Sequence, residues 1–146
     1  MTSPTLNLSV SRTFKARPET VFRAFTDPDW YARWWGPEGS QCRNVRVDLR
    51  EGGSYSLDMH LPDGSIARMY GTYREIVPPE RLVYTWTWEG ENVETLVTLE
   101  LEAVEGGTEL TMTQEGFRDS RAVAMHDHGW SGSLDRLEGL LPELAE

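Results

Sequence analysis

Residues 97–114, VTLELEAVEGGTELTMTQ, contain two stretches in which apolar and polar side chains alternate. The Gly106-Gly107 pair between the two stretches is typical of a tight turn. Because successive side chains of a strand point to opposite faces, this pattern predicts an antiparallel hairpin with one buried face. The apolar residues of that face are Val97, Leu99 and Leu101 in the first strand and Leu110 and Met112 in the second.

The alternation continues toward the N-terminus, from about residue 45 to residue 88. Turn-forming sequences at residues 51–53, 62–64 and 78–79 divide this region into separate strands. A further alternating stretch occupies residues 6–14. The whole pattern predicts an antiparallel sheet of about six or seven strands, with one apolar face throughout. Residues 66–75 fit either orientation, and we expect one set to face inward: Ala67, Met69, Gly71 and Tyr73.

Helical signals lie on both sides of the sheet sequence. Pro18 and the Asp27-Pro28 pair are typical of helix starts and predict two short helices, the second ending at residues 36–39, GPEG. A long C-terminal helix, whose continuation Pro142 limits, follows from apolar residues at intervals of four, three and four. These residues are Trp130, Leu134, Leu137 and Leu141.

An apolar sheet face needs an apolar cover, and the C-terminal helix is the one that the sequence offers. We therefore predict an α+β fold in which a curved antiparallel sheet surrounds the long C-terminal helix. Two short helices follow the first strand. The length of 146 residues fits a single domain over residues 1–146.

The composition limits the kinds of binding partner and the cellular location that we expect for this protein. With 14 Lys and Arg against 24 Asp and Glu, the net charge of -10 repels nucleic acid and anionic membrane surfaces. No apolar run is long enough to span a membrane, and no signal peptide opens the chain. The single cysteine, Cys42, cannot form an internal disulfide. We expect a cytoplasmic protein. The sheet should have edge strands that can pair with a second copy, so a homodimer is a further expectation that the sequence allows.

The inward face of the sheet is rich in aromatic and methionine residues, in a chain that has six Trp and five Tyr. Such side chains form adaptable walls for apolar ligands, although they also fill ordinary protein cores. We predict that the following residues surround a cavity for a small, largely apolar or amphipathic ligand: Trp34, Trp35, Tyr55, Met59, Met69, Tyr73, Tyr84, Trp86, Met112, Gln114 and Trp130.

The sequence offers few groups for catalysis. Gln114 continues the inward series of its strand, so its amide needs a partner from the protein, a water molecule or a ligand. His126 and His128 lack further residues that would complete a metal site, and the histidines are expected to lie away from the cavity. No nucleophile elbow or phosphate-binding loop is present. We therefore assign no catalytic residue, metal or cofactor.

Four sequence segments together resemble one known family. They are residues 14–22, FKARPETVF; Asp27-Pro28 with Trp34-Trp35-Gly36-Pro37; Gly71 through Pro78-Pro79-Glu80-Arg81-Leu82; and Glu115-Gly116-Phe117 with Gly129-Trp130.

From about Leu8 to Leu141 the chain resembles the START-like (SRPBCC, helix-grip) superfamily and, within it, the bacterial family related to the activator of the heat-shock-protein-90 ATPase. The resemblance implies a sheet curved around the terminal helix, with a cavity between them. Relatives in the wider superfamily bind lipids, sterols or hormones, cyclise polyketides, or contact proteins. The resemblance therefore implies functions of these kinds without selecting one. Many relatives carry a histidine near Gln114, and its replacement by glutamine argues against acid–base catalysis here.

Three hypotheses about function follow. The first is the binding of a small, largely apolar ligand in an internal cavity. The second is a protein-interaction module, such as a regulator of a chaperone ATPase. Its candidate surface is a series of acidic residues: Glu89, Glu91, Glu94, Glu100 and Glu102. The alternative interpretation of this series is a sheet face exposed to solvent. The third is a cyclase or hydrolase-like cavity enzyme, for which no general base is evident.

Overall fold

A computed structural model describes residues 6–36, 39–91 and 93–144 of the chain. Seven strands form one antiparallel sheet in the order β1-β7-β6-β5-β4-β3-β2, which confirms the predicted sheet. The strands are β1 (Leu6–Phe14), β2 (Gln41–Val47), β3 (Ser54–His60), β4 (Ile66–Val77), β5 (Arg81–Trp88), β6 (Glu94–Val104) and β7 (Gly107–Phe117).

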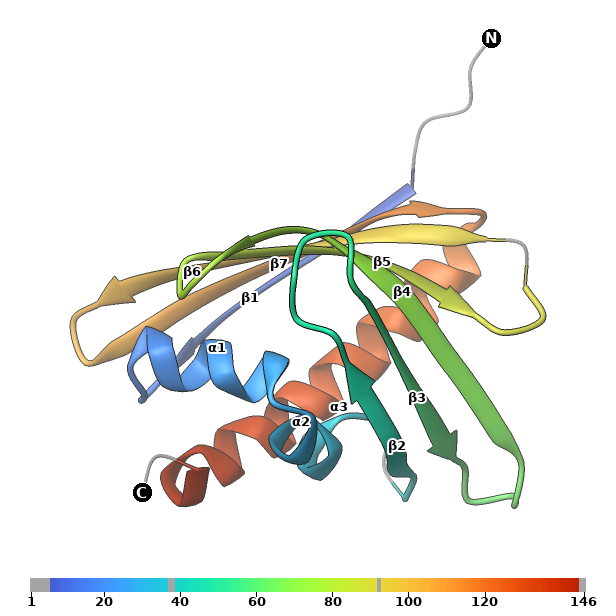
Figure 1. Cartoon of the computed structure of the whole chain (residues 1–146), viewed down its shortest axis with the longest axis horizontal. Coiled ribbons are helices and arrows are strands. Elements are labelled where there is room, and N and C mark those ends of the chain that lie inside the picture. The colour runs from blue at the N-terminus through green and yellow to red at the C-terminus, as the bar shows by residue number, and fades with distance from the viewer. Residues whose placement is uncertain (1–5, 37–38, 92, 145–146) are drawn as a thin grey trace, which may run out of the picture.

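Three helices lie on one side of this bent sheet (Figure 1). They are α1 (Pro18–Thr26), α2 (Pro28–Trp34) and α3 (Ser120–Leu144). The two short helices and the long one contact each other, and α3 also contacts β1 and β7. The α+β helix-grip fold that the sequence predicts is therefore confirmed.

The short helices begin where the sequence predicts. Pro18 opens α1, and the Asp27 carboxylate caps α2 by accepting hydrogen bonds from the N–H groups of Asp29 at 2.9 Å and Trp30 at 3.4 Å. These bonds satisfy donors that the first helical turn cannot pair internally. In the predicted stop at residues 36–39, Pro37 and Glu38 lie outside the described residues.

The hairpin at residues 97–114 supplies the centre of the core. In the β6–β7 register Val97 lies opposite Gln114, Leu99 opposite Met112, and Leu101 opposite Leu110. All six side chains are buried. The predicted apolar stripe of α3 is also buried, so the sheet face and the helix cover each other: Trp130, Leu134, Leu137 and Leu141.

Helix α3 differs from the prediction at both ends. It begins at Ser120, well before the apolar stripe, and the Asp119 carboxylate accepts a hydrogen bond from the N–H of Ala122 at 2.8 Å. The helix also continues through Pro142 to Leu144, so the prediction that Pro142 limits it is wrong. A proline this close to the end removes only one backbone bond from the last turn. Within the described residues, no helix is long and apolar enough to cross a membrane.

Candidate functional site

The deepest of the predicted cavity residues surround almost no space. Tyr55, Tyr73 and Tyr84 line a void of about 10 Å³, which holds no more than about one water molecule. The Tyr55 hydroxyl donates a hydrogen bond to the carbonyl oxygen of Thr85 at 2.6 Å. Burial raises the pKa of Tyr73 and Tyr84 above the usual tyrosine value, so both phenols stay neutral. These tyrosines form a packed inner core.

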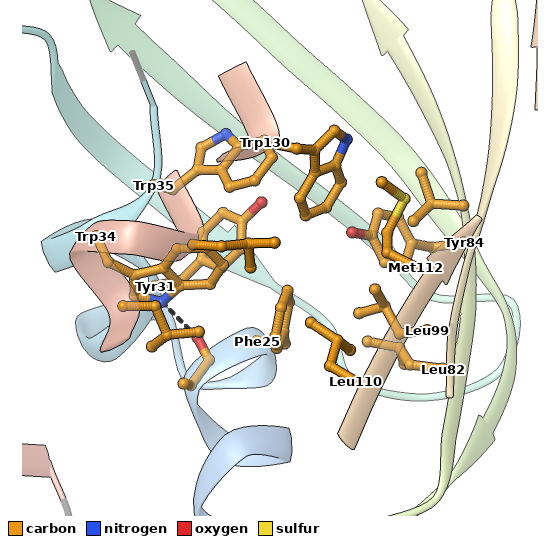
Figure 2. Close-up of a cluster of buried hydrophobic side chains, with 14 of the residues drawn as sticks. Phe25, Tyr31, Trp34, Trp35, Leu82, Tyr84, Leu99, Leu110, Met112 and Trp130 are labelled. Carbon is orange, nitrogen blue, oxygen red and sulfur yellow. Dashed lines mark hydrogen bonds between the residues drawn. The ribbon is translucent and has the colours of Figure 1, made fainter. Parts of the chain in front are cut away.

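Trp34, Met69 and Met112 are completely buried, with no exposed surface. The Trp34 indole N–H donates to the carbonyl oxygen of Ala24 at 3.0 Å. Figure 2 shows Phe25 of α1 and Trp34 of α2 in the same cluster of buried side chains as Leu110 and Met112 of β7. The structure therefore places these three predicted residues in the interior packing between helices and sheet.

Gln114 is completely buried and makes its hydrogen bonds within the protein. Its amide oxygen accepts from the indole N–H of Trp130 at 2.9 Å, and its amide nitrogen donates to the Thr95 hydroxyl at 2.8 Å. Thr95 in turn donates to the carbonyl oxygen of Trp86 at 3.2 Å. This chain of bonds connects α3, β7, β6 and β5, and it supplies the protein partners that a buried amide requires.

A larger pocket opens between the sheet and the first half of α3, and its volume is about 370 Å³. We call it the outer pocket. Four predicted residues line it: Trp35, Met59, Trp86 and Trp130. The remaining lining residues were not predicted as a site: Gly36, Leu61, Ala67, Trp88, Glu89, Glu91, Met125, His126, Gly129 and Ser133.

The inner wall of the outer pocket is a cluster of indole rings. The ring of Trp35 packs edge-on against those of Trp86 and Trp130, with centroids 5.1 and 4.7 Å away. The Trp86 and Trp130 centroids are 5.7 Å apart. Edge-to-face contacts of this kind hold aromatic side chains in a defined arrangement. The outer pocket therefore has an aromatic base and a rim that includes Met125, which is 68% exposed.

His126 lies in the wall of the outer pocket, so the prediction that the histidines lie away from the cavity is wrong for this residue. The error arose because the sequence pattern did not reveal the first turns of α3, which carry His126 onto Trp86 and Phe117. Strand β7 ends at Phe117 and α3 begins at Ser120. A short connection between the last strand and the helix is the feature that could have located the start of α3.

The two ring nitrogens of His126 have distinct partners. The indole N–H of Trp88 can only donate, so His126 Nε2 accepts from it at 3.4 Å. His126 Nδ1 then carries the proton and donates to the carbonyl oxygen of Ala122 at 2.9 Å. Burial lowers the pKa of His126 below its ordinary value of 6.5. Neutral His126 is consistent with both contacts, because a protonated ring would lose the acceptor for Trp88.

We expect His126 to make stability pH-dependent. Since its pKa is lowered in the folded state, the unfolded chain binds a proton here at a higher pH than the folded chain does. The free energy of unfolding therefore falls as the pH drops through 6.5 and stops falling below the folded pKa. Urea unfolding at pH 7.5 and at pH 5.5 measures this effect. Between these two pH values the free energy of unfolding should fall less in His126→Gln than in the wild type. The exposed His128 gives a matched control, and His128→Gln should behave as the wild type; an unchanged loss in His126→Gln would contradict the assignment.

Other candidate chemistry is not assembled around the pocket. Within residues 6–36, 39–91 and 93–144, no group of three or more His, Cys, Asp or Glu residues is placed to hold a metal ion. Ser133 lies in the pocket wall, but its hydroxyl exchanges hydrogen bonds with the backbone of Gly36 at 3.1 and 3.2 Å.

A bent antiparallel sheet that packs on a long terminal helix, with an apolar pocket opening between them, defines a START-like helix-grip protein. Residues 15–142 match the family model described as Activator of Hsp90 ATPase homolog 1-like protein. The chain therefore belongs to this family.

Solved structures agree with this assignment. A protein from Chromobacterium violaceum is 33% identical with a TM-score of 0.88, and the match covers 92% of this chain and 96% of that one. A Rhodobacter sphaeroides protein is 29% identical with a TM-score of 0.86, with 97% of each chain covered. An AHSA1 protein from Silicibacter pomeroyi is 25% identical with a TM-score of 0.85, covering 94% of this chain and 98% of that one. No curated protein matches the sequence.

Proposed function

We propose that this protein binds a small, largely apolar molecule in the outer pocket. The observation that carries the proposal is the lining of a pocket of about 370 Å³ by indole rings and methionine side chains. Ligand pockets of small molecules have volumes of about 300–1,000 Å³ and mostly apolar walls. START-like proteins commonly bind ligands in a cavity between the sheet and the helix, which adds support from the family.

The proposal narrows the predicted binding residues. It retains Trp35, Met59, Trp86 and Trp130, which line the outer pocket, and adds Met125 and His126 from the unpredicted part of α3. The tyrosines and the fully buried Trp34, Met69, Met112 and Gln114 would then support the pocket from beneath. Binding by the tyrosines would require the void of about 10 Å³ to expand greatly.

A variant that fills the outer pocket tests the proposal. A Cβ atom at Gly129 would meet no atom within 4 Å, and Gly129 lines the pocket, so the side chain of Gly129→Leu has room to occupy it. We expect the neutral apolar dye N-phenyl-1-naphthylamine to fluoresce more strongly with the wild type. Gly129→Leu should weaken its binding at least about tenfold, which corresponds to about 1.4 kcal/mol.

Gly139→Leu is the matched control, because Gly139 is exposed on the same helix and a Cβ atom there also meets nothing within 4 Å. This variant should bind the dye as the wild type does. Equal binding by the wild type and Gly129→Leu would place the dye elsewhere, and no binding at all would count against the proposed function. Native mass spectrometry of gently purified protein can then identify a ligand that co-purifies.

A protein partner is the second candidate, suggested by the family description and by exposed Glu89, Glu91 and Glu94. Two of these carboxylates already have partners in the protein: Glu89 lies 3.5 Å from Arg68 and Glu94 lies 3.9 Å from Arg74. The surface therefore offers a basic partner less unpaired charge than the sequence suggests. Pull-down with all three glutamates changed to lysine tests it, and an unchanged set of captured proteins would exclude this surface.

A further inference from the structure

Two indole N–H groups in the wall of the outer pocket have no acceptor. Trp35 is 6% exposed and Trp86 is 4% exposed, and neither indole nitrogen has a hydrogen-bond partner within the part of the chain that the structure describes. A buried donor without a partner destabilises the folded protein, and neighbouring ring faces compensate only weakly. A ligand that brings an acceptor into this pocket would remove that cost.

Other indole N–H groups of the protein have acceptors from the fold itself. Trp34 donates to the carbonyl oxygen of Ala24 at 3.0 Å, and Trp130 donates to Gln114 at 2.9 Å. Trp88 donates to His126 at 3.4 Å. The fold thus provides acceptors for the tryptophans around Trp35 and Trp86, while the two unpaired indole donors belong to side chains of the pocket wall.

The rings that carry the two donors are neighbours in the pocket wall. The ring centroids of Trp35 and Trp86 are 5.1 Å apart and the ring planes meet at 61°. A carbonyl oxygen has two lone pairs and can accept two hydrogen bonds at once. Both nitrogens are enclosed by neighbouring side chains, so the two hydrogen bonds require the rings to turn toward the ligand. Figure 2 shows the Trp35 nitrogen on the side of its ring that faces away from Phe25 and the inner core.

The charges around the outer pocket indicate a neutral ligand. Its described lining contains Glu89 and Glu91 but no Lys or Arg, and burial keeps His126 neutral. Arg68, beside the mouth, is already paired with Asp58 at 2.9 Å and with Glu89 at 3.5 Å. A carboxylate or phosphate would meet repulsion without a compensating cation. A carbonyl group only accepts, so it would bring no additional donor that the apolar wall must satisfy.

We infer that the ligand of the outer pocket is a neutral, largely apolar carbonyl compound, such as a ketone or an ester. Its oxygen accepts hydrogen bonds from the indole N–H groups of Trp35 and Trp86. This inference rests on the proposed function, because it specifies the chemistry of the molecule in the same pocket.

A matched pair of probes tests it on the intact protein. Tetralin and 1-tetralone have the same fused-ring skeleton and differ at one carbon, which carries a carbonyl oxygen in the ketone only. We expect 1-tetralone to bind about tenfold more tightly, because its oxygen accepts hydrogen bonds that tetralin cannot form. In ¹H–¹⁵N spectra it should move the indole N–H signals of Trp35 and Trp86 downfield.

Internal controls are available in the same spectrum. The Trp34 N–H is already bonded to Ala24 and lies in the inner core, so its signal should stay in place. Single Trp→Phe variants assign the signals. Trp86→Phe should lose most of the preference for 1-tetralone over tetralin, while Trp30→Phe, which changes a partly exposed indole stacked on Arg23, should keep that preference. If Trp86→Phe does not fold, the wild-type spectra decide.

The possible outcomes separate the two proposals. Equal binding of tetralin and 1-tetralone, without movement of the two indole signals, would overturn the carbonyl assignment and leave apolar binding supported. Tighter binding of the anion 1-naphthoate than of 1-tetralone would overturn the neutral class. Binding of none of these probes would contradict both the carbonyl assignment and the proposed function.

Discussion

Replacing Trp130 with alanine should lower the free energy of unfolding by about 3–5 kcal/mol, the usual cost of deleting a buried large aromatic side chain. Trp130 is 1% exposed and packs against the rings of Trp35 and Trp86. Its indole N–H also donates to buried Gln114 at 2.9 Å. The substitution therefore opens a cavity under α3 and leaves the amide oxygen of Gln114 without this donor.

Urea unfolding of three variants separates packing from hydrogen bonding. Trp130→Phe keeps a ring but removes the N–H, so it should cost less than Trp130→Ala yet at least about 1 kcal/mol. Trp30→Ala is the control, because Trp30 is only partly buried and stacks on the Arg23 guanidinium at 4.2 Å. Its cost should be clearly smaller than that of Trp130→Ala. Equal costs for Trp130→Ala and Trp30→Ala would contradict a central role for Trp130 in joining α3 to the sheet.

Replacing Gly71 with alanine should be the second large effect, at about 3 kcal/mol, near the upper end for overpacking. A Cβ atom at position 71 would lie 1.9 Å from the carbonyl oxygen of Thr85 and 2.7 Å from the ring of Tyr55. Gly71 pairs with Tyr55 across β3 and β4, and the Tyr55 hydroxyl donates to that same Thr85 oxygen. The backbone of β5 would have to move away from β4, which would disturb this bond.

The control for Gly71→Ala is Gly139→Ala in α3, where an added Cβ atom meets nothing within 4 Å. Alanine favours a helix over glycine by about 1 kcal/mol, so this variant should be as stable as the wild type or more stable. Thermal and urea unfolding measure both variants. A change of less than about 0.5 kcal/mol in Gly71→Ala, the range of ordinary surface substitutions, would show that β4 and β5 can separate easily.

The elements of the fold were largely predictable because their signals are local. Alternation in residues 97–114 reflects strand geometry, and each inward residue of that hairpin is buried. Asp27 caps α2 as its sequence position predicts. The beginning of α3 was not predictable in the same way. Residues 120–129 lack a continuous apolar stripe, since this part of the helix borders pockets and solvent.

The candidate site was less predictable than the fold. Strand parity identifies which side chains face inward, and it correctly groups Tyr55, Tyr84, Trp86 and Met112 with the interior. The alternation of side chains along a strand does not show how completely the sheet and the helices fill the space between them. The structure fills the tyrosine end of the interior to a void of about 10 Å³ and leaves about 370 Å³ at the end near Trp86 and Met125.

By itself, the sequence determined the α+β architecture, the inward face of the sheet and the family resemblance, because residue periodicity and local motifs encode them directly. Only the tertiary structure decided where open space remains, and it brought His126 to Trp88 and gave Gln114 its partners in Trp130 and Thr95. It also left Trp35 and Trp86 without acceptors. These features depend on the distance and angle between elements far apart in the chain, and side-chain packing sets both.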